Sequence, residues 1–163
     1  MSIDEIRAQV ESLDGVLVLA PQPGDGSPEI AWGDLFFYYA PDGVLPQTQP
    51  FATIVTKEYP DEPGSGLDRP GAFRLNVAAG SAEFRRWAGH DPPAPPGRPG
   101  GVEDDVVRAH PTYGRLGWLC VVNPGPRTAT AVRELVTTAH GLARQRHHRR
   151  AADPSGPEAP TGG

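Results

Sequence analysis

The sequence predicts an α+β fold in which a single antiparallel sheet of five to six strands has helices packed on one face. Apolar residues repeat at helical spacing near the two ends of the chain, whereas the middle holds short apolar runs separated by turn signals. The 20 Gly and 20 Pro residues cluster between those runs and therefore separate ordered elements. A length of 163 residues suits one domain with a substantial core.

The chain is predicted to begin with an amphipathic helix over residues 2–13. Ser2 and Glu5 have capping-box spacing, in which a hydroxyl and a carboxylate each bond a free backbone amide. Apolar side chains then recur at helical spacing, at Ile3, Ile6 and Val10. The apolar run 16–20 is too short for a helix and predicts a strand.

A hairpin is expected next, because the runs 29–32 and 35–39 flank the dipeptide Gly33-Asp34. The second run, LFFYY, places aromatic side chains on both of its faces. We expect this strand to be central and covered on both sides. The second cover is either packing within the fold or a loop, a partner or a ligand.

The runs 51–57 and 72–78 predict two more strands around a polar, Gly/Pro-rich excursion, which is either a lid or a solvated connector. In 72–78 apolar residues alternate with Arg74 and Asn76, so a guanidinium and an amide share one face. If the sheet carries a binding surface, we expect it here.

Helix-capping residues and Pro/Gly-rich stretches predict the bounds of the remaining elements. Ser81 is expected to cap a short helix that reaches residue 88, and the Pro/Gly-rich stretch 89–101 is a predicted spacer. Residues 102–109 suggest a further helical turn or two, and 117–123 a strand. Thr128 or Thr130 is expected to cap a last helix that ends near 146. The predicted domain is 1–147, and 148–163 a disordered tail.

Charge and hydropathy bear on the class of protein. Residues 1–143 carry 11 basic and 18 acidic groups, a net of −7, whereas residues from 144 onward carry four Arg and two acids, a net of +2. An acidic body repels a phosphate backbone, so nucleic-acid binding by the body is disfavoured. No apolar stretch is long enough for a membrane span, and the N-terminus lacks signal-peptide features, so we expect a cytoplasmic protein without a membrane partner.

Few side chains stand out as candidates for chemistry. No nucleophile elbow, GxGxxG or P-loop is present, so no cofactor is predicted. The single cysteine, Cys120, leaves no thiolate partner for zinc, and its apolar run predicts a buried packing role; no metal site is predicted. His110 is either a general base or ligand anchor, or a turn histidine bonded to a nearby carbonyl.

Two further groups are candidates near the excursion. Arg74, Asn76, Asp68 and Arg69 could bind a carboxylate or phosphate through the arginine fork, or one arginine pairs with Asp68 to pin the loop. Glu58, Asp61 and Glu62 could supply paired carboxylates, but nothing in the sequence fixes their geometry.

Several long blocks resemble a family of small uncharacterised bacterial proteins, a domain of unknown function. They are the GD dipeptide before FFYY, FATIVTK, RPGAFRLNVAAG and HPTYGRLGWLCVVNPGPRTATAVRELVTTAH. The layout is more distantly similar to the MmcQ/YjbR-like proteins. That resemblance implies a frataxin-like, double-wing fold, and some of those relatives are labelled DNA-binding.

Three functional hypotheses follow. The first is a non-catalytic domain that binds a small molecule or a protein partner, with a pocket formed by Arg74, Asn76, Trp32 and the loop 58–70. The second is an enzyme acting on a small metabolite, with His110 and an acid from Asp68 or Glu58; a pocket that brings His110 near Arg74 would favour it over the first. The third is a DNA-binding protein that uses the Arg-rich end of the last helix.

Overall fold

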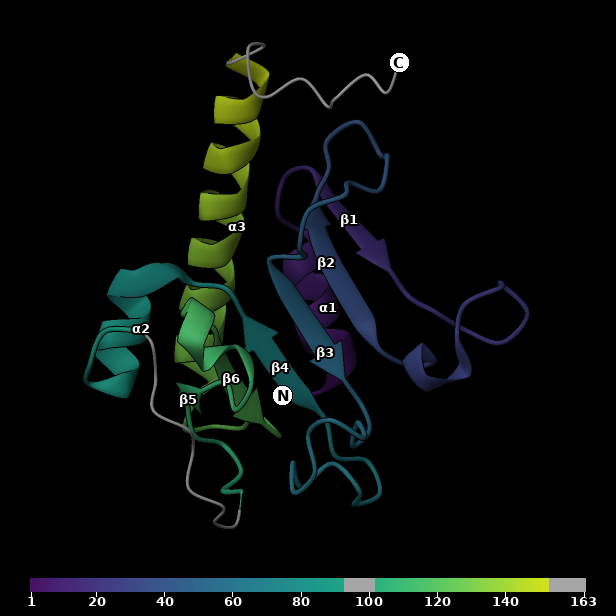
Figure 1. Ribbon diagram of the computed structural model, residues 1–163, viewed down its shortest axis with the longest axis vertical. Coiled ribbons are helices and arrows are strands. Elements are labelled where there is room, and N and C mark those ends of the chain that lie inside the picture. Colours follow the sequence, from purple (N-terminus) through teal and green to yellow (C-terminus); the bar gives the residue numbers. More distant parts are fainter. Residues whose placement is uncertain (93–101, 153–163) are drawn as a thin grey trace, which may run out of the picture.

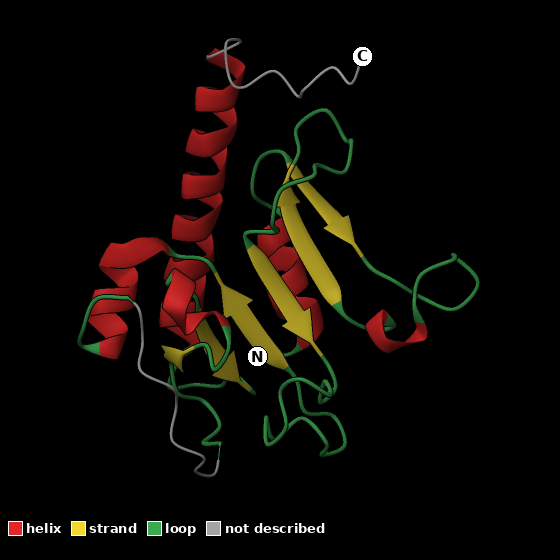
Figure 2. Ribbon diagram, viewed as in Figure 1, coloured by secondary structure: helices red, strands yellow, loops and turns green. Residues whose placement is uncertain are grey.

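An antiparallel sheet backed by helices makes up the part of the chain that the computed structural model describes, residues 1–92 and 102–152 (Figure 1). Within these ranges the strands follow the order β1-β2-β3-β4-β6-β5 and every neighbouring pair is antiparallel (Figure 2). The predicted α+β class is confirmed. The strands are β1 Val16–Leu19, β2 Leu35–Tyr39, β3 Ala52–Val55, β4 Arg74–Val77, β5 Arg108–Ala109 and β6 Leu119–Val122. The helices are α1 Ile3–Glu11, α2 Gly80–Ala88 and α3 Ala129–Ala152, with 3₁₀ turns at Glu29–Ala31 and Tyr113–Leu116.

The helices bury one face of the sheet in an apolar core. Alternate side chains of the strands point toward them, and in Figure 1 α1 lies behind β2 and β3. Ile6 and Val10 of α1 and Val132 and Val136 of α3 are fully buried in this core. The strands contribute Leu35, Phe37, Ala52, Ile54, Leu75, Val77, Leu119 and Val121.

The first helix forms as its sequence predicts. Ser2 Oγ accepts a hydrogen bond from the Glu5 amide at 3.1 Å, and the Ser2 amide donates to Glu5 Oε2 at 2.7 Å. This complete capping box satisfies two of the free amides at the helix start.

The predicted hairpin at Gly33-Asp34 is wrong, because residues 29–31 form a 3₁₀ turn instead of a strand. The Asp34 side chain explains the difference. It is fully buried and accepts hydrogen bonds from the Thr56 amide and hydroxyl, both at 2.8 Å, and from Lys57 Nζ at 3.1 Å. Asp34 therefore binds the end of β3 and does not form a two-residue turn.

Two other local predictions also need correction. Residues 102–109 contain no helix; they end in the short strand β5, which pairs with β6. The helix α2 forms where expected, but its N-cap is Ala79, with no side-chain hydrogen bond, so Ser81 does not cap it.

The last helix starts with the help of a distant carboxylate. Asp105 accepts hydrogen bonds from the amides of Gly125, Arg127 and Thr128 at 2.8–2.9 Å, and also one from the Thr128 hydroxyl. A sequence search for a local cap cannot find such a partner. The helix continues to Ala152, so 148–152, predicted as tail, are helical. The rest of the predicted tail, 153–163, and most of the predicted spacer, 93–101, lie outside the described residues.

Part of the opposite face of the sheet, at the ends of β3 and β6, is covered by the loop between β3 and β4, and we call this face the loop-covered face. Leu67 and Ala72 of this loop pack against Val55 and Val122, which point away from the helices. On this face the strands present a mixed set of polar and aromatic side chains, namely Phe36, Tyr38, Thr53, Arg74 and Asn76.

Candidate functional site

A cavity of about 470 Å³ lies on the loop-covered face of the sheet. Its size falls in the range of small-molecule sites. Most of its wall is apolar or aromatic. The wall residues come from both 3₁₀ turns, from the strands β2 and β3, from the loop after β3 and from the residue before β6. They include Ile30, Phe36, Tyr38, Val55, Tyr59, Tyr113, Leu116 and Trp118.

A row of buried polar side chains forms the floor of this cavity. Arg74 Nε donates to Asn76 Oδ1 at 2.8 Å, and Asn76 Nδ2 donates to Thr53 Oγ1 at 2.9 Å. Arg74 and Asn76 are each only 3% exposed. They sit two residues apart on β4, and Thr53 is opposite Asn76 on β3, so the pleat of the sheet directs all three side chains to one face.

Glu62, in the loop between β3 and β4, bonds the Arg74 end of this polar row. Its Oε2 accepts from Arg74 Nη2 at 2.6 Å, and its Oε1 accepts from the Thr112 hydroxyl at 2.8 Å. Burial would raise the pKa of Glu62, but the hydrogen bond and charge of Arg74, together with the Thr112 hydroxyl, lower it below the ordinary value. Glu62 is therefore an ionised partner that neutralises the Arg74 charge.

His110 completes the group in an uncharged form. Its Nδ1 accepts from the amides of Thr112 and Tyr113 at 3.1 and 2.9 Å, so Nε2 carries the ring proton. Burial and the Arg74 charge lower the pKa of His110 to about 4, although Glu62 opposes this. Nε2 lies 3.2 Å from Arg74 Nη2 and 3.8 Å from Glu62 Oε1. The approach to Arg74 joins two N–H groups and is not a hydrogen bond.

Two donor groups of cavity-lining residues have no acceptor among the described residues: Nη1 of Arg74, and Nε2 of His110, which lies 3.8 Å from Glu62 Oε1. Nε and Nη2 of Arg74 are bonded to Asn76 and Glu62, whereas Nη1 has no hydrogen-bond partner among residues 1–92 and 102–152. Because Arg74 lines the cavity, a ligand there meets a guanidinium N–H.

The rim of the cavity is fixed by Asp34. The Tyr59 hydroxyl donates to Asp34 Oδ2, and burial together with this hydrogen bond raises the pKa of Tyr59 well above its usual value. The Tyr59 ring lines the cavity, so the buried carboxylate holds one of its walls in place.

The structure brings some of the predicted site residues together and separates others. Arg74, Asn76 and His110 line the cavity, whereas Trp32, Arg69, Asp68 and Glu58 do not. Trp32 Nε1 donates to the Ser27 carbonyl at 3.3 Å, and Glu58 Oε1 accepts from the Gly64 amide at 2.9 Å. The expected loop pair forms with a different acid, since Arg69 bonds Asp104 at 2.8 Å in place of the exposed Asp68.

Two predictions about single residues also have an outcome here. Cys120 is buried, as its apolar run predicts, and burial raises the pKa of its thiol to about 11. His110 is bonded to nearby backbone, as a turn histidine, but through amides and not through a carbonyl.

Sequence reasoning missed most of the cavity wall. Tyr59, Tyr113 and Trp118 were not singled out, and Glu62 was weighed only as one of several paired carboxylates. One usable signal was present, because aromatic residues on both faces of β2 indicate that a second cover lies over Phe36 and Tyr38.

The described part of the chain shows neither a metal site nor a helix that could cross a membrane. No three His, Cys, Asp or Glu side chains of residues 1–92 and 102–152 are grouped so that they could hold a metal ion. In the same ranges, no helix combines the length and the apolar character needed to cross a membrane.

Comparison with known proteins gives a family but no function. A family of unknown function, DUF6194, matches residues 1–152, so the chain belongs to that family. No curated protein and no solved structure matches the chain.

Proposed function

We propose that this DUF6194 protein is a non-catalytic domain that binds a small molecule, with a planar ring and a hydrogen-bond acceptor of that molecule lying in the apolar-walled cavity. A single observation carries the proposal: a polar row lies at the floor of an aromatic-walled cavity and leaves Arg74 Nη1 and His110 Nε2 without an acceptor among the described residues. Pockets for small ligands commonly combine apolar walls with a few fixed polar groups.

The charges at the floor favour a neutral acceptor on the ligand. Arg74 and Glu62 form a pair whose side chains are 4% and 11% exposed, so their charges cancel within the site. His110 is uncharged at neutral pH because its pKa is about 4. A carbonyl or hydroxyl oxygen can accept from Arg74 Nη1 without adding net charge, whereas the rings of Tyr38, Tyr113 and Trp118 can stack on a planar ligand.

The enzyme hypothesis has one observation in its favour, namely the 3.2 Å contact between His110 and Arg74 inside the cavity. The protonation states of His110 and Glu62 argue against the enzyme hypothesis. A general base needs a free lone pair, but Nδ1 of His110 is bonded to two amides and Nε2 carries the proton. Glu62 is a weak base because Arg74 holds its pKa low. The group therefore suits recognition better than proton transfer.

Two finer expectations from the sequence stay predictions. These are the likeness to MmcQ/YjbR-like proteins, with the DNA binding that it implies, and the cytoplasmic location.

The proposal can be tested with a thermal-shift screen of uncharged ring compounds that carry one carbonyl or hydroxyl. A ligand at a hundredfold its Kd adds about 2.7 kcal/mol to the free energy of unfolding, which raises Tm by several degrees. Tyr113→Ala, at a residue that lines the cavity and is 44% exposed, should abolish the shift.

Leu45→Ala is the matched control, because Leu45 is 48% exposed and does not line the cavity. It should leave the ligand-induced shift unchanged. A compound that stabilises the wild type and both variants equally binds elsewhere, and a screen without any hit would argue against a small-molecule site.

A further inference from the structure

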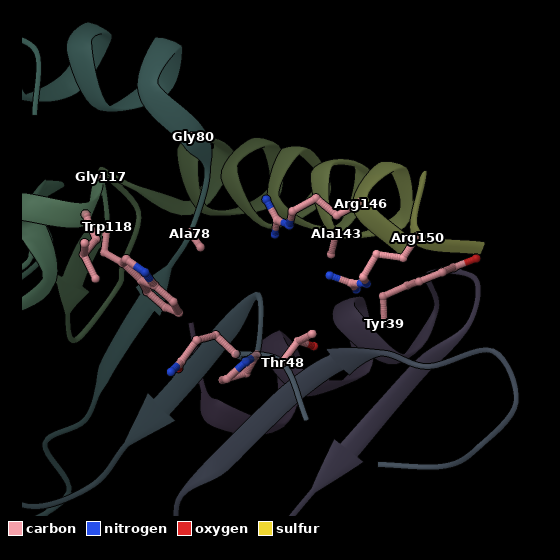
Figure 3. Close-up of a pocket in the computed structure, with 12 residues that line it drawn as sticks. Tyr39, Thr48, Ala78, Gly80, Gly117, Trp118, Ala143, Arg146 and Arg150 are labelled. Atoms are coloured by element: carbon pink, nitrogen blue, oxygen red, sulfur yellow. The ribbon is translucent and has the colours of Figure 1, made fainter. Parts of the chain in front are cut away.

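A second cavity, of about 250 Å³, adjoins the first beside α3 (Figure 3). The two cavities share Gln49, Pro50, Leu116 and Trp118 as lining residues. In Figure 3 the side chains of Arg146 and Arg150 extend from α3 into this space, with Thr48 and Trp118 across from them. The two cavities thus form adjoining parts of one concave surface.

The arginines continue the sheet-facing stripe of α3. Ala139 is buried in the core, and Ala143, Arg146 and Arg150 follow it at spacings of four, three and four residues, which keeps them on one side of the helix. The stripe therefore changes from apolar to cationic where α3 borders the second cavity. Both arginines are exposed to solvent and line the second cavity.

Among residues 1–92 and 102–152, the charges in this cavity have no carboxylate counter-ion, because no carboxylate there forms a salt bridge with Arg146 or Arg150. The pKa of Arg146 is lowered by burial and by the neighbouring charges of Arg150 and Arg149. Two like charges at i and i+4 destabilise a helix. Cations near a helix C-terminus interact favourably with the helix dipole, but this interaction does not require two of them to line the same cavity.

We propose that the second cavity is a subsite for a phosphate group, held between the guanidinium groups of Arg146 and Arg150. This inference rests on the proposed function, because it assigns an anionic group to the same ligand whose ring lies in the first cavity. Arginine forks suit phosphate oxygens, and Thr48 and Gln49 add uncharged hydrogen-bonding side chains to the lining. The ligand class is therefore a phosphate ester of a small ring compound.

The position of these arginines favours a small ligand over a nucleic-acid strand. Both side chains extend into a recess between α3 and residues 48–50. Arg144 and Arg149 are also exposed but do not line the recess, so a nucleic-acid backbone would meet all four arginines, whereas a ligand in the recess meets only two.

Pyrophosphate is a suitable probe, added to the full chain and followed by amide NMR at low salt. We expect saturable shifts at Thr48, Gln49 and the Trp118 indole. The double variant Arg146→Gln/Arg150→Gln should weaken binding at least tenfold, because charge-assisted hydrogen bonds are lost. The control Arg144→Gln/Arg149→Gln makes the same change in net charge on the same helix and should retain the wild-type affinity.

Three results would overturn the subsite. They are the absence of saturable shifts, equal weakening in both double variants, and displacement of pyrophosphate by a short DNA duplex with equal dependence on all four arginines. The last result would assign the helix end to nucleic-acid binding. Uncharged ring compounds separate this failure from failure of the proposed function, because they report on the first cavity whether or not phosphate binds.

Discussion

On β2, β3 and β4, successive side chains point to opposite faces of the sheet, toward helices on one face and toward the loop and the cavity on the other. The helix-covered face holds an apolar core that includes Phe37, Ile54 and Leu75. The loop-covered face buries Arg74 and Asn76 to the same degree, with 3% exposure each, beside a cavity of about 470 Å³. Burial alone therefore does not distinguish a core from a site.

The difference between the two faces lies in what the buried groups require. Apolar side chains need only close packing, which helices provide. Buried polar groups each need a partner, and the loop supplies Glu62 while the turn after β5 supplies Thr112 and the amides that bond His110. One face therefore stabilises the fold, and the other holds polar groups in positions where a ligand can meet them.

The largest contrast is expected between two neighbouring phenylalanines on β2. Phe37→Ala should lower the free energy of unfolding by about 4 kcal/mol, because Phe37 is fully buried in the helix-covered core. Phe36→Ala, at a half-buried residue that lines the cavity, should cost about 1 kcal/mol. Urea unfolding measures the loss of free energy of unfolding in each variant. Equal losses would mean that the loop-covered face is an ordinary core.

The next contrast compares a buried ion pair with an exposed one. Glu62→Ala leaves the Arg74 guanidinium buried without its partner and should cost about 3 kcal/mol. Glu103→Ala breaks the exposed pair with Arg127 and should cost less than about 0.5 kcal/mol. If both variants unfold at the same urea concentration as the wild type, the polar row does not depend on Glu62.

A smaller effect is expected from the titration of His110. Its pKa in the folded state is about 4, below the ordinary 6.5, so between these values the unfolded chain binds the proton and the folded chain does not. The contribution of His110 to the free energy of unfolding is therefore fully present above pH 6.5, and it is lost as the pH drops toward 4. Stability at pH 5 should be about 2 kcal/mol lower than at pH 8 from this residue.

His110→Asn should remove this pH dependence while keeping an acceptor oxygen near the amides of Thr112 and Tyr113. His90→Asn is the matched control, because His90 is exposed and outside both cavities. Urea unfolding at several pH values between 8 and 4.5 gives the slope of the free energy of unfolding against pH for each variant. An unchanged slope in His110→Asn would show that another group titrates.

The helix-covered face was the more predictable of the two. Periodicity places Ile6, Val10, Leu75 and Val77 in the core, and the capping box marks the start of α1, because these signals are local in the sequence. The alternation that sets Arg74 apart from Leu75 also predicted which face carries the polar groups.

The partners of those polar groups were not predictable from local patterns. Asp34 bonds Thr56 across 22 residues, and Glu62 bonds Thr112 across 50. Asp105 caps a helix that begins 24 residues later. Such pairs depend on how the chain folds back over the sheet, and neither spacing nor composition encodes that path.

The central claim, that the loop-covered face binds a ligand, is tested most directly by methyl NMR of the full chain with an uncharged ring compound from the screen. The methyl groups of Val55, Ile30 and Leu116 line the cavity, and those of Ile54, Leu75 and Val77 lie in the helix-covered core. We predict saturable shifts for the first three and none for the second three. Shifts confined to the second three, or spread equally over both sets, would contradict the claim.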